Sequence, residues 1–293
     1  MTRQKIAFIV NPISGTKDKE QILSYAKSYS GLSGSDLTFY KTTGPCDATV
    51  AAKRFAEEGY ATVVAVGGDG TVNEVAQGLM HTPTCLGIIP TGSGNGLARD
   101  LGIPMNYQKA VATLVNGNSI AIDAGKLNDK TFFCTSGVGY DAFVGNRFAQ
   151  AKTRGILTYV KIAIGKFLTY KPENYRLQVN GKAMELKAFL ITVANASQWG
   201  NNAHIAPEAD MTDGLFDVVI VSPFPLYAAP TLGIKMFRSK LNRSQYVSII
   251  RCDSLTIERE QGGYIHYDGE PGTMGTNLSF SIIPTALNVI AGR

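Results

Sequence analysis

The chain has 293 residues, of which 44% are apolar and 17% charged, and this balance excludes a disordered chain and indicates two globular domains. The net charge of +5 suits an anionic ligand or membrane surface but is too diffuse to indicate a nucleic-acid-binding protein. No apolar run is long enough for a signal-peptide core or a membrane span, and the four scattered cysteines contain no Cys-x-x-Cys pair. We therefore expect a cytoplasmic protein without a disulfide framework or zinc site.

The first part of the chain alternates predicted strands with predicted helices. Apolar, β-branched runs predict strands, and 3.6-residue periodicity predicts helices, with Asp47 expected to cap the second helix. The strands are expected at 5–10, 37–40, 61–66 and 85–90, and the helices at 20–29, 47–58, from 71 onward and at 97–101. This alternation predicts an α/β domain with a doubly wound parallel sheet.

Glycine-rich loops follow the first, third and fourth predicted strands, at 11–15, 67–71 and 91–96. Ligands of doubly wound sheets bind beyond the carboxyl ends of the strands, so we expect these loops to converge. Gly67-Gly68-Asp69-Gly70 leads into a helix, and backbone N–H groups at a helix N-terminus favour phosphate. Asp69 would repel phosphate unless a cation such as Mg²⁺ lies between them. A plain glycine turn with Asp69 as a helix cap explains the same residues equally well.

After residue 123 short alternating runs replace the strand–helix alternation. They predict an antiparallel β domain, with strands expected at 130–134, 175–179, 186–193, 216–221, 246–252, 255–258 and 278–283. The expected domains are 1–124, with a C-terminal return at 285–293, and 125–284. One helical insertion at 147–171 carries Lys and Arg but no acidic residue. It reads either as a helix that lies on an anionic membrane or, more commonly, as a solvated basic face.

Two acidic loops remain as candidates for chemistry, because no Walker-type loop, Gly-x-Ser-x-Gly elbow or His-based constellation is present. The loop from Pro207 to Asp217 is dense in oxygen ligands, which suit a hard cation, although Asp213-Gly214 also suits a plain turn. In Tyr267-Asp268-Gly269-Glu270 either carboxylate could accept a proton from an attacking hydroxyl, and an Asp-Gly hairpin turn is the alternative.

Five segments in this order resemble the diacylglycerol kinase catalytic domain superfamily, which includes bacterial lipid kinases and sphingosine and ceramide kinases. They are Asn11-Pro12-x-Ser14-Gly15, Gly67-Gly68-Asp69-Gly70-Thr71, Ile88 to Asn95, Ala206 to Leu215 and Asp268-Gly269-Glu270. The resemblance implies a phosphofructokinase-like nucleotide domain followed by an antiparallel β-sandwich. Gly92-Ser93-Gly94-Asn95-Gly96 departs from the common bacterial pattern towards that of sphingosine kinases, but it lies in a nucleotide loop and does not identify the lipid.

The resemblance also implies roles for individual residues. The nucleotide site would contain Asn11, Pro12, Ser14, Gly15, Thr42, Gly67, Gly68, Asp69, Gly70, Thr71, Asn73, Ser93 and Asn95. A structural Mg²⁺ would be held by Asp210, Asp213 and the carbonyl of Leu215. Glu270 is the preferred catalytic base and Asp268 the second choice. Asp69 and Asp123 would belong to a network around catalytic Mg²⁺.

These observations predict an ATP-dependent and Mg²⁺-dependent kinase that phosphorylates a lipid hydroxyl, with diacylglycerol and a sphingoid base among the candidates. Its partners would be a membrane lipid and, through peripheral contact, the inner face of the membrane, with no role for nucleic acid. The oligomeric state stays open, a homodimer included. The alternatives are an NAD kinase-like or other soluble-substrate kinase and a catalytically silent nucleotide- or lipid-binding regulator.

Overall fold

The computed structural model describes residues 3–15, 18–151 and 156–292. The chain divides into two compact units, Met1–Ile122 with Thr285–Arg293, and Asp123–Pro284. We call them the α/β unit and the β unit and describe each by itself. The boundary predicted from composition lies at 124/125, and the first unit ends at Ile122.

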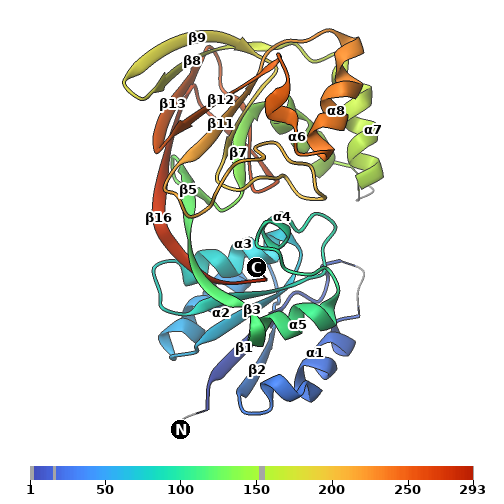
Figure 1. Cartoon of the computed structure of the whole chain (residues 1–293), viewed down its shortest axis with the longest axis vertical. Coiled ribbons are helices and arrows are strands. Elements are labelled where there is room, and N and C mark those ends of the chain that lie inside the picture. Colours follow the sequence, from blue (N-terminus) through green and yellow to red (C-terminus); the bar gives the residue numbers. More distant parts are fainter. Residues whose placement is uncertain (1–2, 16–17, 152–155, 293) are drawn as a thin grey trace. The chain divides into compact units, whose positions relative to one another are not determined.

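The α/β unit is built on a parallel sheet with strand order β2-β1-β3-β4 and with the end of β16 beside β4. Strand β3 is buried along its whole length, which explains its continuous apolar sequence. Helices α2 and α3 pack together on one side and α1 and α5 on the other (Figure 1). The elements are β1 (Lys5–Val10), α1 (Lys19–Ser28), η1 (Ser30–Leu32), β2 (Asp36–Lys41), α2 (Asp47–Glu57), β3 (Thr62–Gly67), α3 (Asp69–Leu79), β4 (Cys85–Pro90), α4 (Gly96–Asp100) and α5 (Tyr107–Asn116).

This arrangement confirms the predicted doubly wound sheet, with two local differences. Helix α5 was not predicted from the sequence, although Ala110 and Val111 are buried and Asn106 caps it by accepting the Lys109 N–H at 3.0 Å. Asp47 is the first residue of α2 rather than its cap. Its carboxylate turns back and accepts the N–H of Thr43 at 2.7 Å and the hydroxyl of Tyr40 at 2.8 Å.

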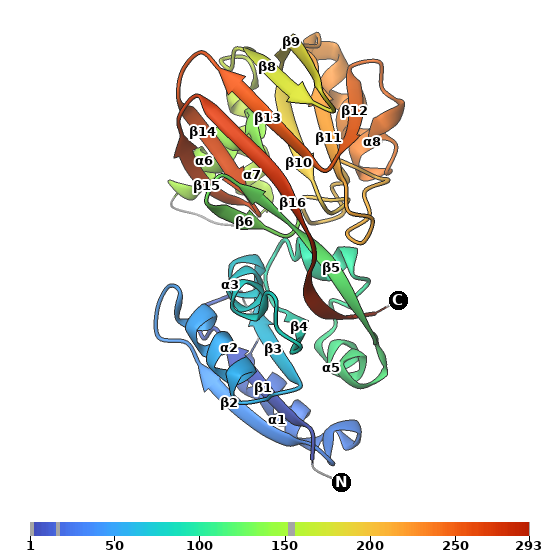
Figure 2. The same ribbon diagram turned by 90° about the vertical axis from the view of Figure 1, so that its left-hand side faces the viewer.

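The β unit is a sandwich of two antiparallel layers. One layer has the order β16-β13-β8-β9 with β5 and β6 at its side, and the other has the order β12-β11-β10-β7-β14-β15 (Figure 2). Its strands are β5 (Asn118–Leu127), β6 (Lys130–Phe132), β7 (Thr135–Gly139), β8 (Glu173–Val179), β9 (Lys182–Ala188), β10 (Leu190–Ala194), β11 (Phe216–Val221), β12 (Val247–Cys252), β13 (Ser254–Arg259), β14 (Gly263–Tyr267), β15 (Glu270–Met274) and β16 (Asn277–Ala291).

The core of the sandwich takes alternate side chains from both layers, such as Leu177 and Ile257 from one and Ile191 and Val218 from the other. The predicted strand at 186–193 is two strands, because the chain breaks at Phe189 between β9 and β10. Strands β7, β14 and β15 were not predicted. They are rich in glycine and polar residues, and their long-range pairings with β10 and with each other place them in the sheet.

The second layer is also covered on its other face, by α6 (Tyr140–Ala149), α7 (Ile156–Phe167) and α8 (Ala229–Phe237), next to the short turns η2 (Leu226–Ala228) and η3 (Leu241–Arg243). The single helical insertion predicted at 147–171 is therefore two helices, and residues 152–155 of it lie outside the described residues. Helix α8 was not predicted. None of the helices in the described part of the chain is long and apolar enough to cross a bilayer.

Candidate active site

The three glycine-rich loops of the α/β unit meet at the carboxyl edge of its sheet, as predicted. The Asn11 side-chain amide donates to the Thr71 hydroxyl at 3.1 Å, which joins the loops after β1 and β3. The Thr91 N–H donates to the Gly67 carbonyl at 2.8 Å, which joins the loops after β3 and β4. The strand order changes direction between β1 and β3, and this is the point where doubly wound sheets bind ligands.

Glycine is required where the loops touch. A Cβ added at Gly92 would lie 2.6 Å from the Gly68 Cα and 2.9 Å from the Asn95 side-chain oxygen. Gly15 has a left-handed backbone with a φ of 63°, and any side chain there would overlap the carbonyl of Thr91. The loops therefore pack backbone against backbone, which leaves their N–H groups close to any ligand bound above them.

Asp69 has a structural partner that the sequence did not reveal. Its two carboxylate oxygens accept the backbone N–H groups of Asn95 at 2.9 Å and Gly96 at 2.7 Å. Asp69 is the first residue of α3, but its side chain thus satisfies N–H groups where the next helix, α4, begins. Asp69 therefore does act as a helix cap, but for α4 and not for its own helix, α3. The predicted magnesium role of Asp69 stays a prediction.

The other predicted nucleotide residues lie in or beside these loops. Thr42 is joined to β1 by its N–H, which donates to the Val10 carbonyl at 3.0 Å. The Asn73 side chain accepts from Gln77 at 2.5 Å on the exposed side of α3. Asn95 is buried and makes two hydrogen bonds with Gly92. Its side-chain amide donates to the Gly92 carbonyl at 2.8 Å, and its side-chain oxygen accepts the Gly92 N–H at 3.1 Å. Pro12 and Ser93 are exposed and Ser14 half-buried, and Gly70 lies in the first turn of α3.

Two further residues of this edge were missed by the sequence analysis. Lys19 is buried, and its ammonium group donates to the Ser14 carbonyl at 2.5 Å, which holds the first loop in place. Thr91 is also buried, and its hydroxyl has no hydrogen-bond partner among the described residues. A buried hydroxyl without a partner is uncommon, and a bound ligand is one way to satisfy it. Lys19 lies outside the glycine motifs and Thr91 begins the third one, but only the packing shows that both side chains are buried.

In the β unit, Asp268 and Glu270 occupy very different environments. Asp268 and Gly269 form the two-residue turn between β14 and β15, and both have a left-handed backbone, with φ values of 47° and 81°. The Asp268 carboxylate accepts the N–H groups of Phe133, Cys134 and Thr135 at 2.7, 2.7 and 3.1 Å. The hairpin interpretation is therefore confirmed, and the carboxylate of Asp268 also fastens the turn to the residues before β7.

Glu270 is exposed at the start of β15. Within the described chain no hydrogen bond or ion pair of its carboxylate is found, and its backbone pairs with Tyr267 across the hairpin. Its side chain is free to accept a proton, whereas the Asp268 side chain is held by three donors. This geometry favours Glu270 over Asp268 as a general base.

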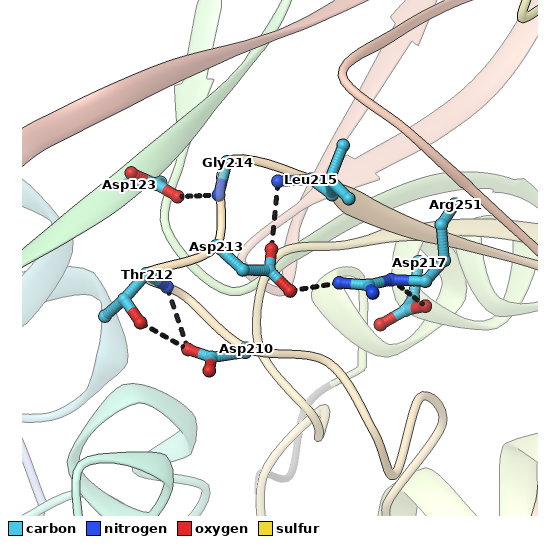
Figure 3. A network of polar contacts seen from close by, with 8 residues as sticks. All are labelled: Asp123, Asp210, Thr212, Asp213, Gly214, Leu215, Asp217 and Arg251. Carbon is cyan, nitrogen blue, oxygen red and sulfur yellow. Dashed lines mark hydrogen bonds and ion pairs between the residues drawn. The ribbon is translucent and has the colours of Figure 1, made fainter.

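The acidic loop is hydrogen-bonded to the first residue of the β unit. Asp123, almost fully buried, accepts the Gly214 N–H at 2.8 Å (Figure 3). The Asp210 carboxylate turns to the N–H and hydroxyl of Thr212, at 2.9 and 2.7 Å. The Asp213 carboxylate accepts the Leu215 N–H at 3.0 Å. These bonds are of the Asx-turn type, which shapes a loop locally.

Arg251 of β12 supplies a positive charge to this loop. Its guanidinium forms an ion pair with Asp213 and lies 3.6 Å from the carboxylate of Asp217 (Figure 3). Burial raises the pKa of Asp217, and the charge of Arg251 opposes that shift. No sequence pattern pointed to Arg251, because it lies 38 residues from Asp213.

The predicted structural Mg²⁺ site would need Asp210, Asp213 and the carbonyl of Leu215 to face one ion. Asp210 and Asp213 point to different partners, and the cation beside Asp213 is Arg251. In the described part of the chain no three His, Cys, Asp or Glu side chains are grouped in a way that could hold a metal ion. The loop as arranged does not fit a Mg²⁺ ion, and we derive no step through one there.

Comparison with known proteins finds two family domains, one after the other along the chain. Residues 5–127 match the diacylglycerol kinase catalytic domain, and residues 135–291 match the YegS C-terminal NAD kinase beta sandwich-like domain. A diacylglycerol kinase of Bacillus subtilis is 30% identical over 287 residues, which are 94% of this chain and 91% of that kinase. The chain belongs to the diacylglycerol kinase family of lipid kinases.

A further relative supports this membership, and a solved structure shows the same fold. A protein of Pseudomonas aeruginosa named as a probable lipid kinase YegS-like is 33% identical over 246 residues, 81% of this chain and 80% of its own length. A crystal structure of a diacylglycerol kinase from Bacillus anthracis has the same fold, with a TM-score of 0.76, 22% identity and coverage of 100% of this chain and 98% of its own. The predicted two-part fold is thereby confirmed.

Proposed function

We propose that this family member transfers the γ-phosphoryl group of ATP to the hydroxyl group of a membrane lipid, with diacylglycerol as the first candidate. The observation that carries the proposal is the convergence of three glycine-rich loops at the switch point of the parallel sheet. The names of the relatives, diacylglycerol kinase and YegS-like lipid kinase, point to a lipid as the acceptor.

The α/β unit would bind the phosphates. The N-cap residue of α3 is Gly68, and among the described residues it has no side-chain cap bond, so the first N–H groups of the helix would be available to an anion. The bonds from Asp69 to Asn95 and Gly96 hold the next loop in register with that turn. The donor would enter as the magnesium complex of ATP, in which the metal offsets the charge of the transferred group.

The β unit would activate the acceptor. The lipid hydroxyl oxygen forms a bond to the γ-phosphorus, its proton passes to the Glu270 carboxylate, and the bond to ADP breaks as ADP takes up the electron pair. Asp268 would act as a positioning residue, because its three hydrogen bonds keep the turn that carries Glu270 in one place. Since the acceptor is a lipid, the protein would work in peripheral contact with a membrane.

A radiolabelled-ATP assay against a panel of acceptors tests this proposal. The panel contains diacylglycerol, phosphatidylglycerol, sphingosine, ceramide and undecaprenol in mixed micelles, and NAD in solution. We expect incorporation into a lipid, with diacylglycerol first, and none into NAD. Phosphorylation of NAD alone would overturn the lipid assignment. Binding of ATP without transfer to any acceptor would indicate a catalytically silent regulator instead.

A further inference from the structure

The exposed apolar side chains of the β unit gather on its helices. Among the described residues of this unit, every large apolar side chain that is mostly exposed belongs to α7, α8 or the turns directly beside them, namely Ile164, Leu168, Leu226, Tyr227, Ile234 and Phe237. Tyr227 is 81% and Phe237 55% exposed. Scattered single apolar residues need no explanation, but a gathering of them on one set of elements marks an interaction surface.

Helix α8 shows why this surface is unusual. Leu232 and Met236 form its inner face and pack into the aromatic cluster beneath the helices. Ile234 and Phe237 lie on the other side of the same helix and are exposed. A helix on the surface of a globular protein normally has a polar outer face. Helix α8 instead has apolar side chains on its outer face that do not pack into the core of the β unit. We call Leu226, Tyr227, Ile234 and Phe237, with the cations named below, the α8 surface.

The charges beside these side chains have one sign. No Asp or Glu occurs between Asp217 and Asp253, a segment that contains Lys235, Arg238, Lys240 and Arg243. Arg238, Lys240 and Arg243 are exposed, and Lys235 donates to the Arg243 carbonyl at 2.8 Å. Glu208, which accepts from Asn242 at 2.7 Å, is a carboxylate that borders the surface on one side.

A second segment of the β unit has the same character. No acidic residue occurs between Asp141 and Glu173. Ile164 of α7 and Leu168, directly after this helix, are exposed beside Lys161 and Lys166. The two segments rest on one aromatic cluster, in which the rings of Phe167 and Phe224 are 5.5 Å apart. Figure 1 shows α6, α7 and α8 together on the side of the β unit away from β8, β9 and β13.

We propose that the α8 surface docks on an anionic lipid bilayer. Aliphatic and aromatic side chains that protrude among cations match the two components of such a surface, because the side chains enter the headgroup–acyl boundary and the cations meet the phosphates. The choice of a bilayer as the partner rests on the proposed lipid kinase function. The α8 surface lies wholly within the β unit, so its docking can be measured without nucleotide and without turnover.

The experiment measures sedimentation of the full-length protein with vesicles of equal parts phosphatidylglycerol and phosphatidylcholine, and with phosphatidylcholine alone. We expect binding to the anionic vesicles that weakens as salt is added. The apolar variant Ile234→Ser/Phe237→Ser should bind roughly tenfold more weakly. The charge variant Arg238→Gln/Lys240→Gln should bind about 25-fold more weakly, about fivefold for each cation.

Matched control variants test whether a loss of vesicle binding is specific to the α8 surface. Val50→Ser/Val115→Ser removes two exposed apolar side chains of the α/β unit, and Lys182→Gln/Lys187→Gln removes two exposed cations of β9. Both should bind like the unmodified protein, and circular dichroism checks that each variant is folded. If the apolar pair does not fold, Leu226→Ser/Tyr227→Ser, which lies outside the helix, replaces it.

Two outcomes would overturn the proposal: folded α8-surface variants that bind anionic vesicles as the unmodified protein does, or variants that lose self-association in sedimentation velocity without losing vesicle binding. Phosphorylation of a short-chain, water-soluble diacylglycerol separates this test from the proposed function. If that acceptor is phosphorylated but the variants bind vesicles normally, docking fails and the function stands. If no lipid is phosphorylated but the variants lose vesicle binding, the function fails and docking stands.

Discussion

The carboxylates of the two units are held in different ways. In the α/β unit the functional edge consists of loops that follow neighbouring strands, and Asp69 binds the N–H groups of the next such loop. In the β unit two of the candidate carboxylates have partners far along the chain, Asp268 with residues 133–135 and Asp213 with Arg251. The first arrangement follows from strand order, whereas the second depends on how the sandwich closes.

This difference shows that acidic residues in similar sequence motifs can have either a structural or a chemical role. Among the candidate carboxylates, Asp69, Asp213 and Asp268 are hydrogen-bonded to backbone N–H groups, as is Asp210 to Thr212. Glu270 is exposed instead. Replacing the first three should therefore affect stability as well as activity, and replacing Glu270 should affect activity alone.

The largest effect is expected for Glu270→Gln. Loss of the proton acceptor should lower kcat about a thousandfold, the middle of the range for general-base catalysis. The melting temperature should not change, because the Glu270 carboxylate is exposed. Glu185→Gln, which changes an exposed carboxylate of β9, is the matched control. A kcat within a few-fold of that of the unmodified enzyme would contradict the assignment of Glu270 as the general base and would favour Asp268 instead.

Asp268→Ala should have the next largest effect. It leaves three buried backbone N–H groups without their acceptor and should lower the free energy of unfolding by about 3 kcal/mol. Asp268→Asn keeps one oxygen and tolerates the left-handed backbone, so it should lose less. Urea unfolding measures both variants. Equal stability of the two variants and the unmodified protein would show that the hydrogen bonds of the Asp268 carboxylate do not stabilise this turn.

Asp69→Ala should lower the free energy of unfolding of the α/β unit by about 2 kcal/mol, since two N–H groups at the start of α4 lose their acceptor. Activity should fall as well, because the loops after β3 and β4 would no longer be held together. Thermal unfolding and ATP turnover are measured, with Asp36→Ala at the exposed start of β2 as the control. Lost turnover with an unchanged melting temperature would instead favour a direct role of Asp69 at the magnesium–nucleotide complex.

The smallest effect is expected for Arg251→Gln. The Arg251 side chain is 50% exposed, so its removal should cost about 1 kcal/mol or less. The variant leaves Asp213 without its cation, and Mg²⁺ should then raise the melting temperature more than it does in the unmodified protein. Arg176→Gln, which removes a surface ion pair with Glu258, is the control. Equal stabilisation by Mg²⁺ in all three proteins, reversed by chelation, would show that the loop binds metal with Arg251 in place.

The sequence was sufficient to predict the parallel sheet of the α/β unit and its glycine loops, although not helix α5. Those features depend on short-range patterns, namely continuous apolar runs for buried strands and glycines where backbone must approach backbone. The β unit was predicted in class but less well in detail. Strand β7 reads as a glycine-rich loop and is a strand only because β10 and β14 lie on either side of it. Helix α8 was missed because Pro230 and Gly233 obscure its periodicity.

For the candidate site, too, some features were predictable from local sequence and others depended on tertiary structure. Sequence patterns established which residues belong to the loops, since strand ends and turn residues are local properties of the chain. Tertiary structure decided what each carboxylate does, because a hydrogen-bond partner can lie more than a hundred residues away, as Phe133 does from Asp268. Burial of those N–H donors makes the partnership obligatory, since an unpaired buried donor is costly. The exposure of Glu270 and the apolar outer face of α8 likewise follow only from packing.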